Sequence, residues 1–185
     1  MNLSLFIVVL GGRSVKSNIE LHDVRWVIGE KLEDTFPELR EQWLGKISGL
    51  HIDSYKCIKY VDGYEIVISR FDKHNLNSPS KEELTLWFVN LGGYNPKKMY
   101  EEHEFRLIVA KKAVDAKKIA KRYWDSDLKI KHNDDYSGIS NFEQFDGFHP
   151  IKKIKNWEIK LLSDPEKRSD KLIPDWYGYR RIDKL

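Results

Sequence analysis

Residues 5–55 begin LFIVVLGGRSVKSNIELHDVRWVIG and end HIDSY, and residues 86–136 begin LWFVNLGGYNPKKMYEEHEFRLIVA and end HNDDY. The two stretches align without a gap at an offset of 81, and 15 of the 51 positions are identical. A constant register over such a span is typical of a duplicated unit. The sequence therefore predicts two copies of one fold in tandem.

Each copy opens with a short apolar run, Leu3–Leu10 or Leu84–Leu91, that ends at a pair of glycines. The length of the run and its β-branched and aromatic residues favour a strand. Both faces of this strand are apolar, whereas a strand with one face in water alternates. We therefore expect a helix to cover one face and the other copy to cover the second.

The rest of each unit follows the same order of elements. A half-buried strand comes next, because His22, Val24, Trp26 and Ile28 alternate with polar residues. A helix is then predicted from the spacing of Phe36, Leu39 and Trp43. The unit closes with a hairpin that turns at Asp62-Gly63. Its last strand recurs at an offset of 93, so the second copy holds 12 extra residues.

The order β-β-α-β-β is that of the β-grasp, or ubiquitin-like roll, in which a helix covers one face of a four-stranded mixed sheet. The predicted fold class is thus α+β, a tandem duplication of this unit in pseudo-twofold relation. We expect the units at 1–72 and 84–163, a linker at 73–83, an insertion near 138–153, and an aromatic, basic tail at 164–185.

The stretch LGGR…ELHDVRWVIG…LHIDSY…VDGYEI resembles the bacterial domain of unknown function family 1543. The resemblance covers both copies, roughly residues 1–165, and is closer in the first. The second copy departs from the pattern with Tyr94 for Arg13, Asn133 for Ile52 and an insertion before the last strand. The resemblance implies one or two copies of such a unit, and it implies no activity, cofactor or catalytic residue.

The composition is that of a globular protein, with 33% charged and 41% hydrophobic residues and a net charge of +3. The basic excess lies in the C-terminal segment. Cys57 is the only cysteine, so no intramolecular disulfide can form, which favours a reducing compartment such as the cytoplasm. No stretch approaches the roughly 20 apolar residues of a membrane span, so no membrane partner is expected.

Polar residues that recur in both copies form the candidate cluster: His22, Arg25, His51, Asp53 and Tyr55 in the first, and His103, Arg106, His132, Asp134 and Tyr136 in the second. Two histidines and a carboxylate are the minimum for an acid–base pair or a divalent metal. On a regular strand His51, Asp53 and Tyr55 share a face. The alternative is structural, since such residues also orient loops and form exposed ion pairs. No HExxH or CxxC spacing predicts a metal, and no cofactor is expected.

The tail interleaves aromatic residues with arginines: Trp176, Tyr177, Tyr179, Arg180 and Arg181. Such a segment can stack on bases and contact phosphates, or it can dock on the body or on a second subunit. Nearby carboxylates favour docking over nucleic-acid binding.

No catalytic signature stands out, and the sequence favours a non-enzymatic binding or interaction module with a protein partner or self-association. A small His/Asp-based or metal-dependent hydrolase that uses His22, His51 and Asp53 is the alternative, and a weak nucleic-acid binder is the second. Whether the protein is an enzyme stays open.

Overall fold

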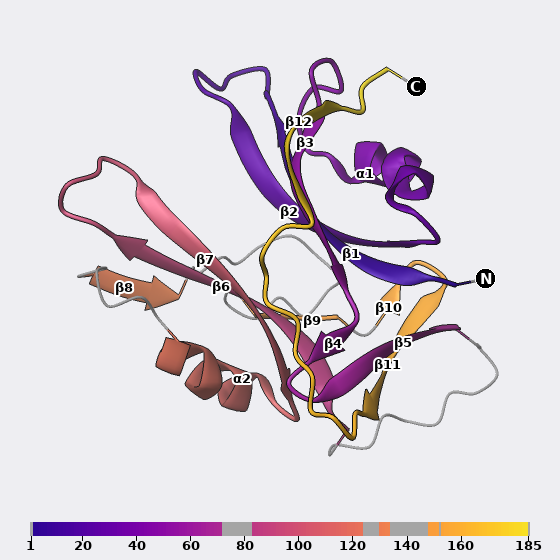
Figure 1. Ribbon diagram of the computed structural model, residues 1–185. Helices are drawn as coiled ribbons and strands as arrows, with labels where there is room; N and C mark the ends of the chain where they lie inside the picture. Colours follow the sequence, from indigo (N-terminus) through magenta and orange to yellow (C-terminus); the bar gives the residue numbers. More distant parts are fainter. Residues whose placement is uncertain (1, 72–82, 124–129, 134–147, 152, 185) are drawn as a thin grey trace.

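The computed structural model describes residues 2–71, 83–123, 130–133, 148–151 and 153–184, with the backbone alone at 123, 130–133 and 148–150. Within these residues the fold is α+β, with three antiparallel sheets and two short α-helices (Figure 1). Each unit has a sheet of its own, and both units contribute to the third.

The sheet of the first unit has the strand order β12-β3-β1-β2. Its strands are β1 (Ser4–Gly12), β2 (Leu21–Gly29), β3 (His51–Ile58) and β12 (Trp176–Arg181). A 3-10 helix, η1 (Leu32–Thr35), leads into helix α1 (Phe36–Gln42), which lies on one face. Pro37 sits in the first turn of α1, where its missing N–H costs no intrahelical bond.

The second unit repeats this plan. Strand β6 (Thr85–Tyr94) pairs with β7 (Glu101–Ala110), β8 (Ile130–Asn133) and β9 (Phe148–Pro150). Helix α2 (Ala113–Ala120) continues into the 3-10 helix η2 (Lys121–Tyr123). Neither described helix has the length and apolar character that crossing a bilayer requires.

The last hairpins of the two units join in one sheet of order β10-β11-β5-β4. Its strands are β4 (Tyr60–Val61), β5 (Tyr64–Arg70), β10 (Lys153–Ile154) and β11 (Trp157–Ser163). The β-grasp prediction is therefore wrong, because all the described strand pairs are antiparallel and β5 pairs with β11 instead of returning to β1. The physical reason is that the partly buried side chains of Ile66, Ile68, Ile159 and Leu161 pack against a core that both units share.

The pairing of β5 with β11 is symmetric in the repeat. Val67 faces Lys160, and these two residues are equivalent at the offset of 93. The flanking pairs, Tyr64 with Ser163 and Arg70 with Trp157, exchange under the same offset. The register at the junction is therefore unchanged when the copies are swapped.

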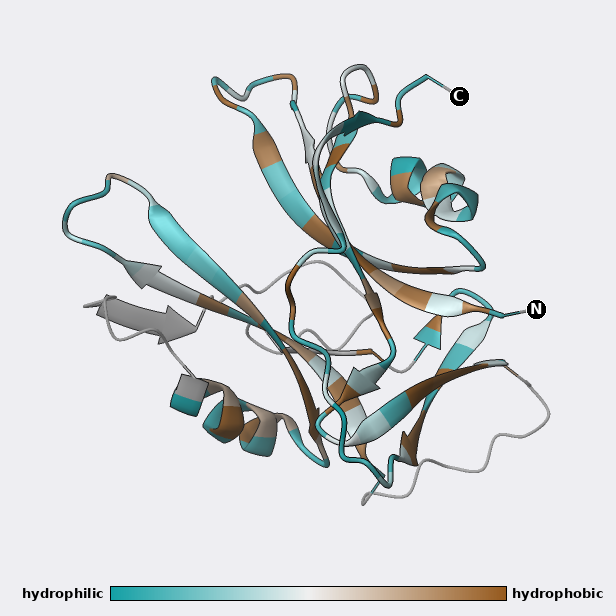
Figure 2. Cartoon of the chain, viewed as in Figure 1, coloured by the Kyte–Doolittle hydropathy of each residue, from teal (hydrophilic) through white to brown (hydrophobic). Residues whose placement is uncertain are grey.

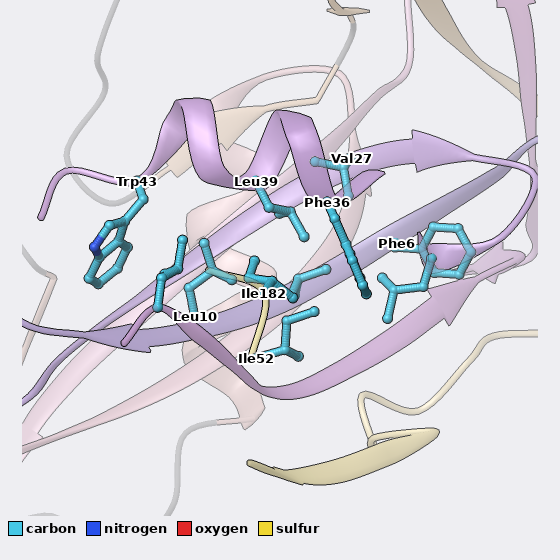
Figure 3. Close-up of a cluster of buried hydrophobic side chains, with 11 residues drawn as sticks. Phe6, Leu10, Val27, Phe36, Leu39, Trp43, Ile52 and Ile182 are labelled. Atoms are coloured by element: carbon cyan, nitrogen blue, oxygen red, sulfur yellow. The ribbon is translucent and has the colours of Figure 1, made fainter. Parts of the chain in front are cut away.

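Both faces of β1 are buried, as the sequence predicted. Phe6, Val8 and Leu10 point to the side of the sheet that α1 covers. They belong to a core that also holds Leu39 and Ile182 (Figure 3). Leu5 and Ile7 face the other way and share a core with Leu86 and Phe88 of the second unit. In Figure 2 the hydrophobic residues accordingly run along the central strands and the inner sides of both helices. The prediction that each copy covers the other is confirmed.

Candidate functional site

A rung of three residues crosses the sheet of the first unit near one end. Gly11 of β1 lies opposite His22 of β2 on one side and opposite His51 of β3 on the other. Alternate residues of a strand point to opposite faces, so these residues share the face turned away from α1. The register thus brings together two histidines that are 29 residues apart in the sequence.

Gly11 is needed for this arrangement because of space. A Cβ atom at this position would lie 2.4 Å from Nε2 of His51 and 2.9 Å from Oδ2 of Asp53. Real side chains do not approach so closely, and glycine in a strand often marks such a close approach. The imidazole of His51 therefore lies directly over the backbone of the central strand.

A β-bulge places the carboxylate of Asp53 in the same group. Leu10 pairs with Ile52 and Val9 pairs with Ser54, so Asp53 is the extra residue of β3. A bulge re-aims side chains and shifts the alternation that follows it. As a result, Asp53 joins His51, whereas Tyr55 turns to the opposite face. The expectation that Tyr55 shares a face with His51 and Asp53 is therefore wrong.

Glu20 completes the group, which we call the polar cluster: Glu20, His22, His51 and Asp53. Nε2 of His51 lies 3.2 Å from Oδ1 of Asp53 and 3.6 Å from Oε1 of Glu20. Nε2 of His22 lies 3.3 Å from Oδ2 of Asp53 and 3.9 Å from Oε2 of Glu20. Both imidazoles thus face the same pair of carboxylates.

The orientation of His51 is fixed by its backbone contact. Its Nδ1 lies 2.8 Å from the carbonyl oxygen of Gly49, which can only accept, so Nδ1 carries a proton. In the neutral ring Nε2 is then an acceptor, and it faces carboxylate oxygens that are acceptors too. The side chain of His51 is only 1% exposed. Among the described residues, neither its Nε2 nor Oδ2 of Asp53 has a hydrogen-bond partner. A positively charged group or a hydrogen-bond donor is therefore the complement of the polar cluster.

No described lysine or arginine supplies that charge. Glu20 and Asp53 make ion-pair contacts with the two histidines alone, whereas Asp164 and Asp183 are each held by an arginine. Among the described residues, no group of three or more His, Cys, Asp or Glu side chains is arranged to hold a metal ion. The two carboxylates carry a formal charge of −2, and their ion-pair partners within the described ranges are imidazoles.

The C-terminal strand β12 holds His51 in place. The ring of Tyr179 packs against the imidazole, with 4.0 Å between centroids and an angle of 31° between the planes. Asp183 accepts the N–H of Gly49 at 2.8 Å, and the carbonyl of Gly49 is the partner of His51. The Arg181 guanidinium beside Asp183 and this N–H hold the pKa of the carboxyl well below its usual range. An ionised Asp183 therefore anchors the loop that orients His51.

The remaining polar candidates of the first unit lie elsewhere. Arg25 pairs with Asp23 at 2.5 Å and donates to the carbonyl of Gln42 at 3.3 Å, on the α1 side of the sheet. Tyr55 packs against Trp176, and Cys57 also packs against the α1-side core. The thiol is thus on the far face of the sheet from His51.

The second unit repeats the rung in its backbone. Gly92 lies opposite His103 of β7 and opposite His132 of β8. His103 also repeats a contact, since its Nε2 lies 3.9 Å from Glu101, as that of His22 does from Glu20. Arg106 is paired with Glu104. Asp134 and Tyr136 lie outside the described residues.

Three residues of this site were missed in the sequence. Glu20 and Gly11 are identical in both copies, as Glu101 and Gly92, so the repeat itself carried the signal. Tyr179 lies 128 residues from His51 in a segment outside the repeat. No local pattern connects that segment to β3.

The polar cluster lies in a part of the chain that matches the model of a protein family. The model of the family described as Domain of Unknown Function (DUF1543) matches residues 17–68 and 98–146, together more than half of the chain. The chain belongs to the DUF1543 family. The two matched regions correspond to two tandem copies. The first DUF1543 copy contains all four residues of the polar cluster, while Gly11 and β12 lie outside the match.

A solved structure has a similar fold. It is the crystal structure of a protein Il1583 from Idiomarina loihiensis, with 29% sequence identity and a TM-score of 0.70. The similarity covers 97% of this DUF1543 chain and 97% of that chain, so it includes both copies and the C-terminal segment. No curated protein matches the sequence.

Proposed function

We propose that this DUF1543 protein is a non-enzymatic binding module and that its polar cluster receives a positively charged, hydrogen-bond-donating group. An ammonium or guanidinium group has this chemistry, whether it belongs to a small molecule or to a side chain of a protein partner. Such groups make strong, charge-assisted bonds to carboxylates.

One observation carries the proposal. Glu20 and Asp53 are two neighbouring carboxylates whose described partners are imidazoles, and Nε2 of the buried His51 forms no hydrogen bond with any described residue. A buried polar atom without a partner is costly, and such atoms in a native protein call for an explanation. A cation that binds here neutralises the carboxylates.

The exposure of the cluster fits a site that is open on one side. His51 forms its floor, while the side chains of His22, Glu20 and Asp53 are 54%, 39% and 29% exposed. Tyr179 packs against the imidazole of His51 and is itself exposed. Its ring offers a second favourable contact, because cations are attracted to aromatic faces.

Calorimetric titration with agmatine, which carries both a guanidinium and an ammonium group, tests the proposal. We expect saturable binding to the wild type and a loss of about tenfold or more in affinity for Asp53→Asn, as for a bond to a charged group. Asp23→Asn is the matched control, because it removes the same charge from β2, on the opposite face of the same sheet. Absence of saturable binding, or equal affinity in Asp53→Asn, contradicts the proposal.

A second candidate function is proton transfer by an enzyme of the His/Asp type. The accessible imidazole of His22 lies 3.3 Å from Asp53, within the reach that acid–base partners need. A hydrolase of this type turns over p-nitrophenyl esters and loses turnover in both His22→Asn and Asp53→Asn. A binding module shows no turnover above that of these variants.

The tail gives less support to nucleic-acid binding. Arg180 is paired with Glu33 at 2.8 Å, and Arg181 is paired with Asp183 at 2.6 Å. Both guanidinium groups are therefore engaged by carboxylates before any phosphate approaches. The lone Cys57 favours a reducing setting, and we infer that the module acts in a bacterial cytoplasm.

A further inference from the structure

A hollow lies where the loop of the β1–β2 hairpin meets the loop after α1. One wall is residues 14–16 and the other is residues 44–46, and the hollow has a volume of about 370 Å³. Volumes of roughly 300–1,000 Å³ are usual for ligand sites. The space above Gly12 on this side is filled by Trp43, whereas Gly11 faces His51. The hollow therefore shares no residue with the polar cluster.

The two loops are fastened to each other. The N–H of Lys46 donates to the carbonyl of Arg13 at 2.7 Å, and Nε1 of the buried Trp43 donates to the carbonyl of Lys46 at 3.1 Å. A Cβ atom at Gly45 would lie 2.6 Å from the Arg13 carbonyl oxygen and 2.7 Å from Nε1 of Trp43. The close contact of the loops thus requires glycine, and the hollow is held open by fixed backbone.

The same loops expose large apolar side chains. Val15 and Leu44, which line the hollow, are 80% and 62% exposed. Ile19 and Ile47 belong to the same two loops and are 75% and 42% exposed. Figure 2 shows hydrophobic residues at the tip of the β1–β2 hairpin. Apolar side chains gathered in this way mark interaction sites more often than scattered ones do.

Basic side chains belong to the same two loops. Arg13, Lys16 and Lys46 make no ion pair with any residue in the described part of the chain. Charged groups at the edge of an interface select a partner of the opposite sign and speed its approach. The surface is thus complementary to a segment that is both acidic and apolar.

We propose that this surface binds an acidic peptide segment of a protein partner that inserts an apolar side chain into the hollow. The extent of the surface favours a peptide over a small carboxylate. A small molecule that fills the hollow leaves Ile19 and Ile47 in water, whereas a peptide that runs across both loops covers them. This inference does not depend on the proposed role of the polar cluster.

The second copy lacks this chemistry in its sequence. At the offset of 81, Leu44 and Lys46 correspond to Asp125 and Asp127, and Val15 corresponds to Pro96. Lys16 alone is retained, as Lys97. The binding surface therefore belongs to the first unit, and Lys97 provides a matched control.

Fluorescence anisotropy with a short labelled peptide, in which glutamates flank a central Trp-Leu pair, tests the proposal. We expect saturable binding that weakens about tenfold in the double variant Lys16→Glu/Lys46→Glu, as two exposed ion pairs become repulsive. Leu44→Ser weakens binding as well, because it removes an apolar wall. Lys97→Glu leaves binding unchanged. All four substituted residues are on exposed loops, and circular dichroism verifies that each variant is folded.

Three results overturn the proposal. The first is no saturable binding of the acidic peptide, and the second is equal binding of a peptide with lysines in place of its glutamates. The third is displacement of the peptide by phenylpropionate at the concentration of the peptide itself, which assigns the hollow to a small carboxylate.

Discussion

The two units share a rung of His, Gly and His, yet the first is completed by a strand from outside the repeat. In the first unit β12 pairs with the edge of β3, and its Tyr179 packs against His51. In the described part of the second unit, β6 pairs with β7, β8 and β9. Duplication therefore provides the scaffold and the rung, and the C-terminal segment is what distinguishes the first site.

The helix faces of the two units differ in a compensating way. Leu39 of α1 corresponds to Ala120 of α2, and Phe6 of β1 corresponds to Trp87 of β6. All four side chains are buried. A smaller residue on the helix is thus met by a larger one on the strand, which keeps the interior filled.

The largest expected effect is a loss of stability in the core of the first unit, to which the C-terminal segment contributes. Ile182 is fully buried in the core of the first unit, and Ile182→Ala leaves a cavity that lowers the free energy of unfolding by about 2–5 kcal/mol. Urea denaturation measures this loss. Ile173→Ala, in the same segment but 63% exposed, changes the free energy by less than about 0.5 kcal/mol. Equal effects would show that the segment is not part of this core.

A smaller effect is expected from closing the space above the rung. Gly11→Ala forces His51 and Asp53 away from β1, and such overpacking costs about 1–3 kcal/mol. Gly92→Ala makes the same change between the same residue types, so we expect the same sign. Urea denaturation of both variants sharpens the comparison, and a neutral Gly92→Ala would mean that the second rung is built differently.

Acid should loosen the C-terminal segment. Hydrogen bonds from Arg168 and Arg181 hold the pKa values of Asp164 and Asp183 below the usual range. Their stabilisation is full above the unfolded pKa of about 3.9 and is lost as the pH falls below it. The urea concentration at the unfolding midpoint of the wild type should therefore decrease as the pH is lowered from about 5 to about 3. The double variant Asp164→Asn/Asp183→Asn should show a smaller fall, and an identical fall would place the acid sensitivity elsewhere.

The smallest effect concerns an exposed contact between the units. Lys155 lies 3.1 Å from Glu41 and 3.7 Å from Glu38 of α1. Lys155→Ala should cost only about 0.2–1 kcal/mol, and added salt should reduce the difference because exposed pairs are screened. Urea denaturation at low and high salt measures it. A larger cost that persists in salt would indicate a junction that depends on this charge.

Sequence reasoning predicted the local elements and the doubly buried β1, because these follow from the period of apolar residues. It could not predict the shared sheet, because Ile66 and Ile159 have the same apolar pattern whichever strand they pair with. The pairing of β12 with β3 could not be predicted for the same reason, because it joins segments that are distant in the chain.

The candidate site was predicted in part for a similar reason. His22, His51 and Asp53 recur in the repeat, and the register does bring them together. The predicted face of Tyr55 was wrong because a β-bulge at Asp53 leaves no clear mark in the sequence. Glu20 was visible as an identity between the copies, but its place in the cluster depends on the path of a loop.

The most direct test of the central claim is an NMR titration of the histidine side chains with agmatine. If Glu20 and Asp53 receive a cation, the ring resonances of both His22 and His51 shift in a saturable way. In Asp53→Asn these shifts require about tenfold more agmatine or more, and in Asp23→Asn they are preserved. Ring resonances that stay unchanged in the wild type, or that shift equally in Asp53→Asn, would contradict the account.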